Sequence, residues 1–401
     1  MIYNVEKGHT LLIKGPSRIE LMKGKIEVFG KLFIPTKQED MNTLVIPSAH
    51  NYPLYALENS ELDIFSNNKE NLVVVAENTI NEEWINIKDK LLTDIKKRDK
   101  DKPLKIMVLG ISSGKTTLIK YLANKFLSEG LNGGYLDSDL GQQLMYLPTT
   151  LNIGQIKDYI VSSADINSED TIFIGSTFPK ANFKFIVSHS CRELIEKYIK
   201  RHGNTDFILI DTDGWIKTEA GIIYKTFFIN TVNPDVIIVF HDDAVDELKE
   251  IEKEASKAKN RKVILLKQKN QYFYEKDKEE RRFMRQSQFA KVLESYRKIT
   301  IPLDGIKFIK SDYDKEGDNI LEVEISKNNL VTLPYQYVII SLMDVDSKLI
   351  KIGLLFVINI ERNYILLYSD MSYKEQIEVK KILLGSLRLS TKGNHQGYLY
   401  L

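Results

Sequence analysis

The sequence predicts an α/β protein: a central P-loop domain with a parallel sheet, flanked by an N-terminal and a C-terminal β-rich domain. Residues 104 to about 300 alternate short apolar runs with helical patterns, whereas the stretches before and after them contain mainly strand-like runs. Continuous apolar strands separated by helices are typical of a parallel sheet covered on both faces. We therefore expect three domains, at residues 1–98, 99–303 and 304–401.

The first predicted domain begins with short strand-like runs and ends in a linking helix. Turn residues such as Gly15-Pro16 and Gly24 separate the runs, which indicates a small sandwich or barrel. From Ile80 to Ile95 the apolar residues keep to one helical face. A charged run and Pro103 then mark the boundary with the second domain.

The second predicted domain opens with a Walker A pattern. An apolar run at 106–109 leads into the glycine loop 110–117, and apolar residues at helical spacing follow. Strand, glycine loop, Lys-Thr and helix together form a P-loop, in which backbone N–H groups and the helix N-terminus bind phosphate. The candidate nucleotide-binding residues are Gly110, Ser112, Ser113, Gly114, Lys115, Thr116 and Thr117.

Within this loop, Lys115 is expected to reach the β- and γ-phosphates of a nucleoside triphosphate, and the Thr116 hydroxyl to ligate Mg²⁺. One position departs from the usual pattern, because Leu109 stands where the first glycine should be and Gly110 comes one residue later. The alternative is an ordinary glycine-containing turn, but Gly-Lys-Thr-Thr at the start of a helix after a strand is a specific signal.

Acidic residues follow two further predicted strands. Asp137 and Asp139 come after the run 134–137, and Asp211 ends the run 207–211. Ligands of open α/β sheets gather beyond the carboxyl ends of the strands, where these residues are expected to lie. A kinase needs one carboxylate near Mg²⁺ and one to accept the proton of the attacking hydroxyl. A helix N-cap or an Asx turn is the structural alternative for the Asp137–Asp139 pair.

Two further stretches admit two interpretations each. Trp215 lies just after Asp211, and its ring can either stack on a base or plug the edge of the sheet. Arg281 and Arg285 are four residues apart, so on a helix they share a face and can stabilise a transferring phosphoryl group. Most charge runs, however, are solvated helix faces with Glu–Arg pairs.

The composition limits the remaining possibilities. The net charge of +1 gives no overall field for a polyanion, so any nucleic-acid binding must depend on a local patch. Cys191 is the only cysteine and lies in a helical pattern, which indicates a packing residue and a reducing compartment. The first residues lack a secretory h-region and the longest apolar stretch is too short for a bilayer. We expect a cytoplasmic protein without a membrane partner.

Six segments in order resemble the polynucleotide 5′-hydroxyl kinases, a family that includes the RNA kinase of pre-mRNA cleavage, the ribosomal-RNA-processing kinase and archaeal relatives. Besides the P-loop and the Asp-x-Asp-x-Gly-Gln stretch from Asp137, the chain has a G-x-T-x-P-x-x-N segment from Gly175 to Asn182. Residues 211–217 match a T-x-G-W-x-K segment, residues 15–30 are similar to the N-terminal nucleotide-contacting segment, and residues 281–285 are similar to an arginine-bearing lid.

The resemblance implies transfer of the γ-phosphoryl group of ATP to the 5′-hydroxyl of RNA, with DNA as a further acceptor. It implies that Asp139 is the catalytic carboxylate and, together with Thr116, a ligand of Mg²⁺. Asp137, two residues earlier, is a further catalytic candidate. The lid arginines, Arg281 and Arg285, would close over the transferring group. The remaining assignments are polynucleotide contacts at Trp215, Thr177, Asn182 and Lys217, and an adenine contact at Glu27.

Two alternatives come from other classes. A regulatory GTPase would use Asp211-Thr-Asp-Gly214 as its D-x-x-G motif, but the chain has no N-K-x-D motif for guanine. A catalytically silent, ATP-bound scaffold of an RNA-processing complex is the second alternative. The presence of Lys115, Asp139 and the arginines opposes it, whereas Leu109 leaves it open.

Overall fold

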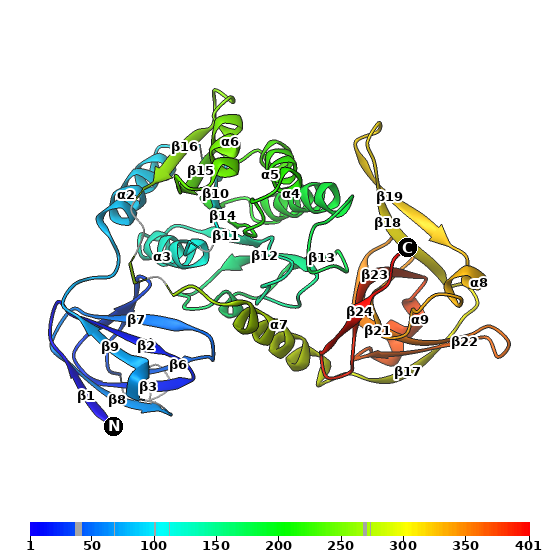
Figure 1. Cartoon of the computed structure of the whole chain (residues 1–401), viewed down its shortest axis with the longest axis horizontal. Helices are drawn as coiled ribbons and strands as arrows, with labels where there is room; N and C mark the ends of the chain where they lie inside the picture. Colours follow the sequence, from blue (N-terminus) through cyan, green and yellow to red (C-terminus); the bar gives the residue numbers. More distant parts are fainter. Residues whose placement is uncertain (37–41, 68, 100–101, 112, 268–270, 273) are drawn as a thin grey trace.

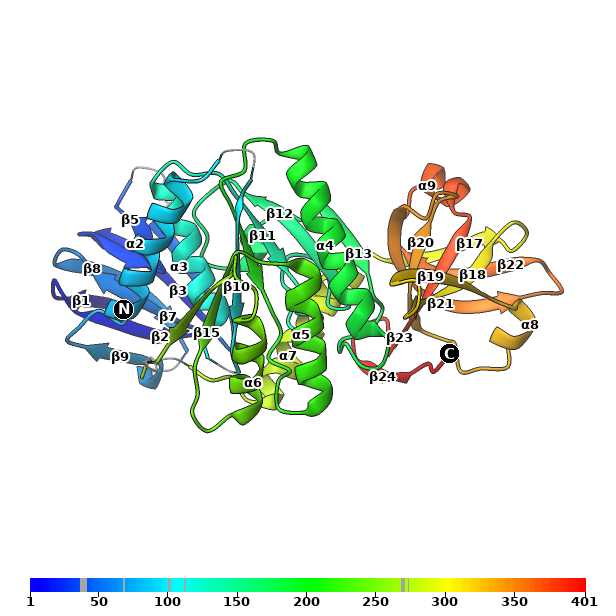
Figure 2. The same ribbon diagram turned by 90° about the horizontal axis from the view of Figure 1, so that it is seen from above.

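The computed structural model describes the chain apart from residues 37–41, 68, 100–101, 112, 268–270 and 273. Figure 1 shows an N-terminal β lobe, a central α/β unit and a C-terminal β lobe in a row, and Figure 2 shows the same order from above. Helix α7 (Lys278–Leu293) runs along the central unit between the two β lobes (Figure 1). The fold class predicted from the sequence is confirmed.

The N-terminal lobe consists of two antiparallel sheets that enclose one apolar core. Alternating burial along the strands directs one face of each sheet inward, as in β3, where Ile19 and Leu21 are buried. The first sheet contains, in spatial order, β1 (Ile2–Val5), β8 (Ser60–Ser66), β3 (Ser17–Lys23) and β6 (Thr43–Ile46). The second contains β5 (Lys31–Phe33), β4 (Ile26–Val28), β7 (Asn51–Ala56), β2 (Thr10–Lys14) and β9 (Leu72–Val75).

Helix α2 (Glu82–Lys96) links this lobe to the central unit, as the sequence predicts. The Asn81 side chain accepts a hydrogen bond from the Trp84 backbone N–H and so caps the helix N-terminus. Its apolar face, from Trp84 to Ile95, packs against α3 (Lys115–Ser128) and one face of the central sheet.

The central sheet has a seven-stranded core with the P-loop strand near its middle. Its spatial order is β13 (Asp170–Phe173), β12 (Thr150–Ile156), β11 (Gly133–Asp137), β14 (Phe207–Asp211), β10 (Leu104–Leu109), β15 (Val236–Phe240) and β16 (Lys262–Leu266). The five neighbouring strands β11, β14, β10, β15 and β16 run parallel. The carboxyl ends of β10, β11 and β14 therefore lie together at one edge of the sheet.

One part of this sheet differs from the all-parallel prediction. Strand β12, which the sequence reading missed, is antiparallel to β11, and β13 is antiparallel to β12. The run at 171–174 therefore belongs to an antiparallel edge strand. The physical reason is the connection: no α-helix lies between β11 and β12, and only the short 3-10 helix η2 (Ser163–Asp165) lies between β12 and β13. A parallel neighbour needs a longer crossover, usually an α-helix.

Helices cover both faces of the central sheet. Ile106 and Val108 of β10 pack with α2 and α3, whereas Met107 and Leu109 pack with helices on the opposite face. Those helices are α4 (Phe183–Arg201), α5 (Glu219–Val232) and α6 (Asp246–Ala255). Cys191 of α4 is fully buried in this second core, which agrees with its interpretation as a packing residue.

The C-terminal lobe is a mostly antiparallel eight-stranded sheet around a third core. Its strands and short helices are β17 (Arg297–Pro302), β18 (Lys307–Asp314), β19 (Asn319–Ile325), α8 (Lys327–Leu330), β20 (Val338–Met343), β21 (Leu349–Asn359), β22 (Tyr364–Ser369), α9 (Tyr373–Glu378), β23 (Lys381–Leu389) and β24 (His395–Tyr398). Strand β17 pairs with β22, so this sheet begins before the boundary expected at 303/304.

Candidate active site

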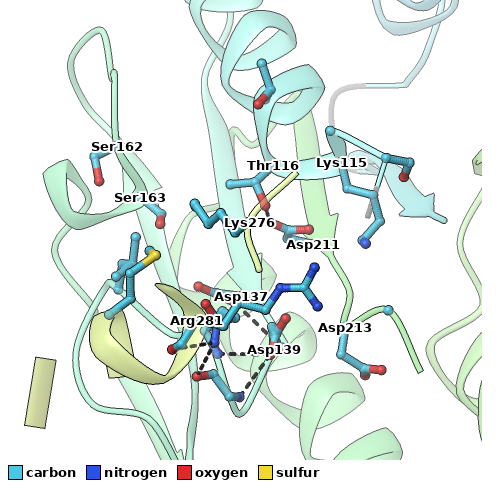
Figure 3. A pocket seen from close by; sticks show the side chains of 18 of the residues that line it. Lys115, Thr116, Asp137, Asp139, Ser162, Ser163, Asp211, Asp213, Lys276 and Arg281 are labelled. Atoms are coloured by element: carbon cyan, nitrogen blue, oxygen red, sulfur yellow. Dashed lines mark hydrogen bonds between the residues drawn. The ribbon is translucent and has the colours of Figure 1, made fainter. Parts of the chain in front are cut away.

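A cavity of about 490 Å³ lies at the carboxyl edge of the central sheet. Its wall is made by the P-loop, the loops after β11, β13 and β14, part of the N-terminal lobe, and α7 with the residues before it. Figure 3 shows Lys115, Thr116, Asp139, Asp211 and Arg281 around this space. Segments that lie far apart in the sequence thus meet at the place where α/β sheets bind ligands.

The P-loop begins at Gly110. The usual pattern has its first glycine one residue earlier, where this chain has Leu109. Gly110 has a φ of 152°, and a Cβ atom there would lie 2.4 Å from Ser113 Oγ and 2.8 Å from Phe240 Cβ. Leu109 is fully buried as the last residue of β10. Gly114 adopts the left-handed conformation and starts α3. The one-residue shift is therefore accommodated by the loop; Ser112 lies outside the described residues.

Lys115 and Thr116 lie at the N-terminus of α3. The Lys115 Nζ atom donates to the Gly110 carbonyl oxygen at 2.7 Å, and burial lowers the pKa of Lys115. The Thr116 hydroxyl donates to Asp211 Oδ2 at 2.6 Å. The sequence prediction for these two residues is thus matched by their positions, because both side chains line the cavity.

Three carboxylates lie side by side at the strand ends. Asp137 and Asp211 are paired in register on neighbouring strands, and both are buried. Burial raises the pKa of Asp137 well above its usual range, and the charges of Asp211 and Asp139 raise it further. Burial also raises the pKa of Asp211 and of Asp139, although Lys115 opposes the shift in both. Shifted carboxylates in a cavity favour acid–base or cation chemistry over a purely structural role.

The Asx-turn alternative also describes part of this geometry. Asp137 Oδ1 accepts from the Asp139 N–H, and Asp139 Oδ1 accepts from the N–H groups of Gly141 and Gln142 at 2.9 and 3.0 Å. Within the described residues, Asp139 Oδ2 has no hydrogen-bond partner, and Asp139 lines the cavity. One oxygen thus fixes the loop, which leaves the other able to meet a ligand.

The residues present fit a nucleoside triphosphate with Mg²⁺. Ser113 Oγ and Asp211 Oδ1 are buried polar atoms without a hydrogen-bond partner among the described residues, and both belong to residues that line the cavity. Among those residues, no cluster of three or more His, Cys, Asp or Glu side chains forms a complete metal cage. Mg²⁺ in phosphate sites usually takes only one or two protein ligands and completes its shell with phosphates and water.

Trp215 forms part of an aromatic wall of the cavity. Its ring lies 4.4 Å from that of the exposed Phe178 and 5.8 Å from that of the buried Tyr224. Both Trp215 and Phe178 line the cavity. Trp215 also packs against the core of the central unit, so the two interpretations of its ring are not exclusive.

A buried ion pair holds the Trp215 loop. Asp213 Oδ1 accepts from the Trp215 backbone N–H at 2.8 Å, and Asp213 Oδ2 accepts from Lys225 Nζ of α5 at the same distance. The Lys225 side chain is fully buried. Loss of either partner would leave an uncompensated buried charge, which makes the pair a firm anchor of the loop.

The other predicted polynucleotide contacts are placed differently. Thr177 lines the cavity. Asn182, by contrast, donates from its side chain to Asp312 of the C-terminal lobe at 2.7 Å, and Lys217 is exposed on the loop after Trp215; neither lines the cavity. The structure therefore brings Trp215 and Thr177 together and leaves Asn182 and Lys217 outside.

Helix α7 supplies the cationic wall. The Asp277 and Glu280 side chains form a capping box at its N-terminus, and Arg281 and Arg285 line the cavity from one face. The Gln142 side chain donates to the Arg281 carbonyl oxygen at 3.4 Å, which links the helix to the Asp139 loop. Lys276, just before the helix, also lines the cavity, and its burial and the nearby Arg281 lower its pKa to about 8.

The N-terminal lobe closes the cavity with Phe29, from the segment 15–30 singled out in the sequence, and with further residues that the sequence analysis did not identify. Phe29, His50, Asn51 and Tyr52 line this wall together with Lys120 of α3. Burial lowers the pKa of Lys120 to about 7 and that of His50 to about 4. His50, Asn51 and Tyr52 line the cavity only because the N-terminal lobe contacts the central unit, and no local pattern in the sequence indicates that contact.

Glu27, the predicted adenine contact, lies on β4 but outside this wall. It forms an ion pair with Lys125 of α3, with 2.7 Å between Glu27 Oε2 and Lys125 Nζ. Neither residue lines the cavity. The structure thus assigns Glu27 to the contact between the N-terminal lobe and α3.

The fold and the site together define a P-loop protein with a cavity at its glycine loop that is suited to phosphate groups. Residues 110–295 match the family model described as the P-loop of the mRNA cleavage and polyadenylation factor CLP1. The chain is 27% identical to a polyribonucleotide 5′-hydroxyl-kinase of Methanocaldococcus jannaschii, over 75% of this chain and 91% of that protein. It is 30% identical to the polyribonucleotide 5′-hydroxyl-kinase of Pyrococcus abyssi, over 54% of this chain and 58% of that one.

These matches confirm the family resemblance seen in the sequence: the chain is related to the polynucleotide 5′-hydroxyl kinases. Among solved structures, Clp1p in a complex with a Pcf11p segment is similar, with a TM-score of 0.73, 15% identity and 97% of both chains covered. At this identity the likeness concerns the fold. In the part of the chain that is described, no helix has the length and apolar character needed to cross a bilayer.

Proposed function

We propose that this protein is an ATP-dependent polynucleotide 5′-hydroxyl kinase that phosphorylates the 5′-OH ends of RNA. The observation that carries the proposal is the convergence of Lys115, Asp139 and Arg281 on one cavity from three separate segments. The names of the archaeal relatives support the same reaction. A scaffold that only holds ATP has no need for Asp139 and Arg281 around the place where a γ-phosphate would be attacked.

The residues divide the chemistry between them. Lys115 and the P-loop N–H groups bind the phosphates, and Thr116 with Asp211 or Asp139 would hold Mg²⁺, which neutralises the developing charge. The free oxygen of Asp139 orients the attacking 5′-hydroxyl and accepts its proton. Arg281 and Arg285 stabilise the charge on the transferring group, an effect worth about 10³–10⁵ in rate for comparable arginines.

Trp215 and Phe178 form the platform for the terminal nucleotide. Their paired rings line the cavity, as does Thr177, the residue before Phe178. Base stacking on aromatic side chains tolerates any sequence, as an enzyme acting on many ends requires. We include an intracellular, cytoplasmic location in the proposal, supported by the lone, buried Cys191.

The test is transfer of the labelled γ-phosphate of ATP to 5′-hydroxyl RNA and DNA oligonucleotides of the same sequence. We expect labelled RNA, and a weaker signal or none with DNA. The matched control is the same RNA with a 5′-phosphate, which has no hydroxyl to accept the label. Parallel reactions with GTP test the choice of base. Labelling of neither oligonucleotide by a folded, ATP-binding protein would refute the proposal and favour the scaffold.

A further inference from the structure

A strip of basic and aromatic side chains leads away from the cavity over the junction of the central unit and the C-terminal lobe. It consists of Lys180, Arg282, His395, Tyr398 and Tyr400, and we call it the junction strip. Lys180 and Arg282 belong to the central unit, whereas the other three lie on or after β24. Figure 1 shows β24 close to the end of α7.

The members of the strip contact one another across the two units. Lys180 Nζ lies 5.0 Å from the ring centre of Tyr398 and 4.9 Å from that of Tyr400. The His395 and Tyr398 rings are 4.8 Å apart, and those of Tyr398 and Tyr400 are 6.2 Å apart. The Tyr400 side chain is nevertheless 70% exposed, so much of its ring surface can still stack on a ligand.

The turn between β23 and β24 fixes the strip against α7. Gly393, with a φ of 80°, lies so close to the helix that a Cβ atom there would be 2.8 Å from the Ala290 nitrogen and from Phe289 Cβ. This contact brings the start of β24 towards α7, and the charges of Arg285 and Arg282 on that helix add to burial in lowering the pKa of His395. The strip is therefore built on a rigid contact.

The strip is continuous with the cavity at two points. Phe178 and Pro179 line the cavity, and Lys180 is the next residue along the chain. Arg285 also lines the cavity, while its charge acts on His395 of the strip. A chain that leaves the Trp215–Phe178 platform past Pro179 thus meets Lys180, whose amine lies against the rings of both Tyr398 and Tyr400.

Three cations of this region lack an acidic partner in the part of the chain that is described, whereas Arg281 pairs with Glu275. Within the described residues, no carboxylate lies within ion-pair distance of Lys180, Arg282 or Arg285, although the chain as a whole carries nearly as many acids as bases. Unpaired cations interleaved with aromatic rings are the pattern by which proteins hold single-stranded nucleic acid, through phosphate attraction and base stacking. A protein partner would more often bring or meet paired charges and a larger apolar area.

We propose that the junction strip binds the nucleotides of the acceptor strand that follow the phosphorylated end, so that the C-terminal lobe takes part in substrate binding. The inference rests on the proposed kinase function for the direction of the strand. It makes the enzyme length-dependent: a strand long enough to reach Tyr400 binds more tightly than a dinucleotide, which occupies only the platform.

The experiment compares a 5′-hydroxyl dinucleotide with a 12-nucleotide RNA in the full-length protein, by KM in the kinase assay and by anisotropy of a 3′-labelled 12-mer. Tyr400→Ala should weaken the 12-mer about 5- to 150-fold, the fold-change of one lost base stack, and leave the dinucleotide unchanged. Lys180→Ala should reduce the slope of log affinity against log salt by about 0.7 for the 12-mer. Tyr400→Trp should retain the affinity.

Tyr373→Ala is the matched control, because Tyr373 is 76% exposed on α9 in the same lobe. It should change neither substrate. Equal KM values for the two lengths in the unaltered protein, or equal weakening of both by Tyr400→Ala, would overturn the strip while leaving the kinase in place. Length-dependent binding without any phosphorylation would support the strip and refute the kinase.

Discussion

The two ends of the cavity are built in different ways. The phosphate end is one continuous stretch, Gly110–Thr117, completed by strand ends that lie side by side in the sheet. The end proposed to hold the acceptor is assembled from Phe178 and Trp215, which come from two loops and meet only through tertiary contacts. Hydrogen bonds between neighbours in the chain fix the first end, whereas the second depends on the packing of whole elements.

This difference should separate substitutions that affect ATP binding from substitutions that affect the placement of the acceptor. The P-loop is held by backbone geometry that the sequence specifies locally, so substitution of a side chain that lines the cavity there, such as Lys115, should remove one function and leave the structure intact. The wall formed by Trp215 and Phe178 is held by contacts that also belong to the core of the central unit. The loop that carries Trp215, for example, is anchored to α5 by the buried Asp213–Lys225 pair. Substitutions at the two ends should therefore differ in which substrate they affect.

The largest effect is expected at Lys115, at the phosphate end. Lys115→Ala should abolish phosphoryl transfer, because the charge that neutralises the β- and γ-phosphates is lost. The melting temperature should not fall, because among the described residues the Lys115 amine bonds only to the Gly110 carbonyl, and burial already disfavours its charge. Transfer rates and a thermal melt check both parts. Near-normal transfer by the folded variant would contradict the kinase mechanism.

Asp139 comes next, at the border between the two ends. Asp139→Asn should lower turnover by about 10²–10⁴, the usual value of general-base help, while ATP binding persists. The amide oxygen can still accept from Gly141 and Gln142, so the loop should keep its form. Asp137→Asn is the comparison variant. If it caused the greater loss of turnover, the assignment of the two acids would be reversed.

A smaller effect is expected at Trp215, at the acceptor end. Trp215→Ala should weaken binding of a 5′-hydroxyl oligonucleotide by about 1–3 kcal/mol, the range of one lost base stack, and hardly change ATP affinity. Turnover should also fall if the hydroxyl is misplaced. Separate titrations of ATP and oligonucleotide measure the two affinities, and Phe178→Ala is a parallel test of the same wall. Equal weakening of both ligands with a large drop in melting temperature would make Trp215 a core residue only.

The smallest effect concerns pH and Lys276. Its pKa is lowered from 10.5 to about 8, so between these values the free protein carries a mostly neutral amine there. A bound polyphosphate favours the charged form and raises the pKa again, so ATP binding at pH 9 should take up a fraction of a proton, and affinity should fall as pH rises above 8. Calorimetry in buffers of different ionisation enthalpy measures the uptake. Lys276→Arg should reduce it, because arginine stays charged; unchanged uptake would exclude Lys276 as its source.

Much of the phosphate end could be predicted from the sequence. The loop 110–117, the acids after β11 and β14, and the shared face of Arg281 and Arg285 all follow from local spacing, and the structure places them at one cavity. The roles assigned to them stay predictions until the variants are measured.

The rest depends on contacts that no local pattern encodes. His50 and Asn51 reach the cavity because the N-terminal lobe lies against α3, and Lys276 lines it from the residues just before α7. The same kind of contact removes residues from the site: Glu27 is taken up by Lys125, and Asn182 by Asp312. Sequence motifs therefore identify the chemistry better than they identify the walls.

The contact between Gly175 and β23 limits how the chain can be divided. A Cβ atom on Gly175 would lie 2.3 Å from the Gly385 Cα atom, and the Gly175 carbonyl accepts from the N–H groups of Ser386 and Leu387 at 2.8 and 3.2 Å. The two main chains are thus in direct contact and joined by two hydrogen bonds. Gly175 lies only two residues before Thr177, which lines the cavity. A shortened protein that lacks the C-terminal sheet would lose the support of its acceptor loop, so chimeras and minimal kinases made from this scaffold need the sheet as well as the P-loop unit.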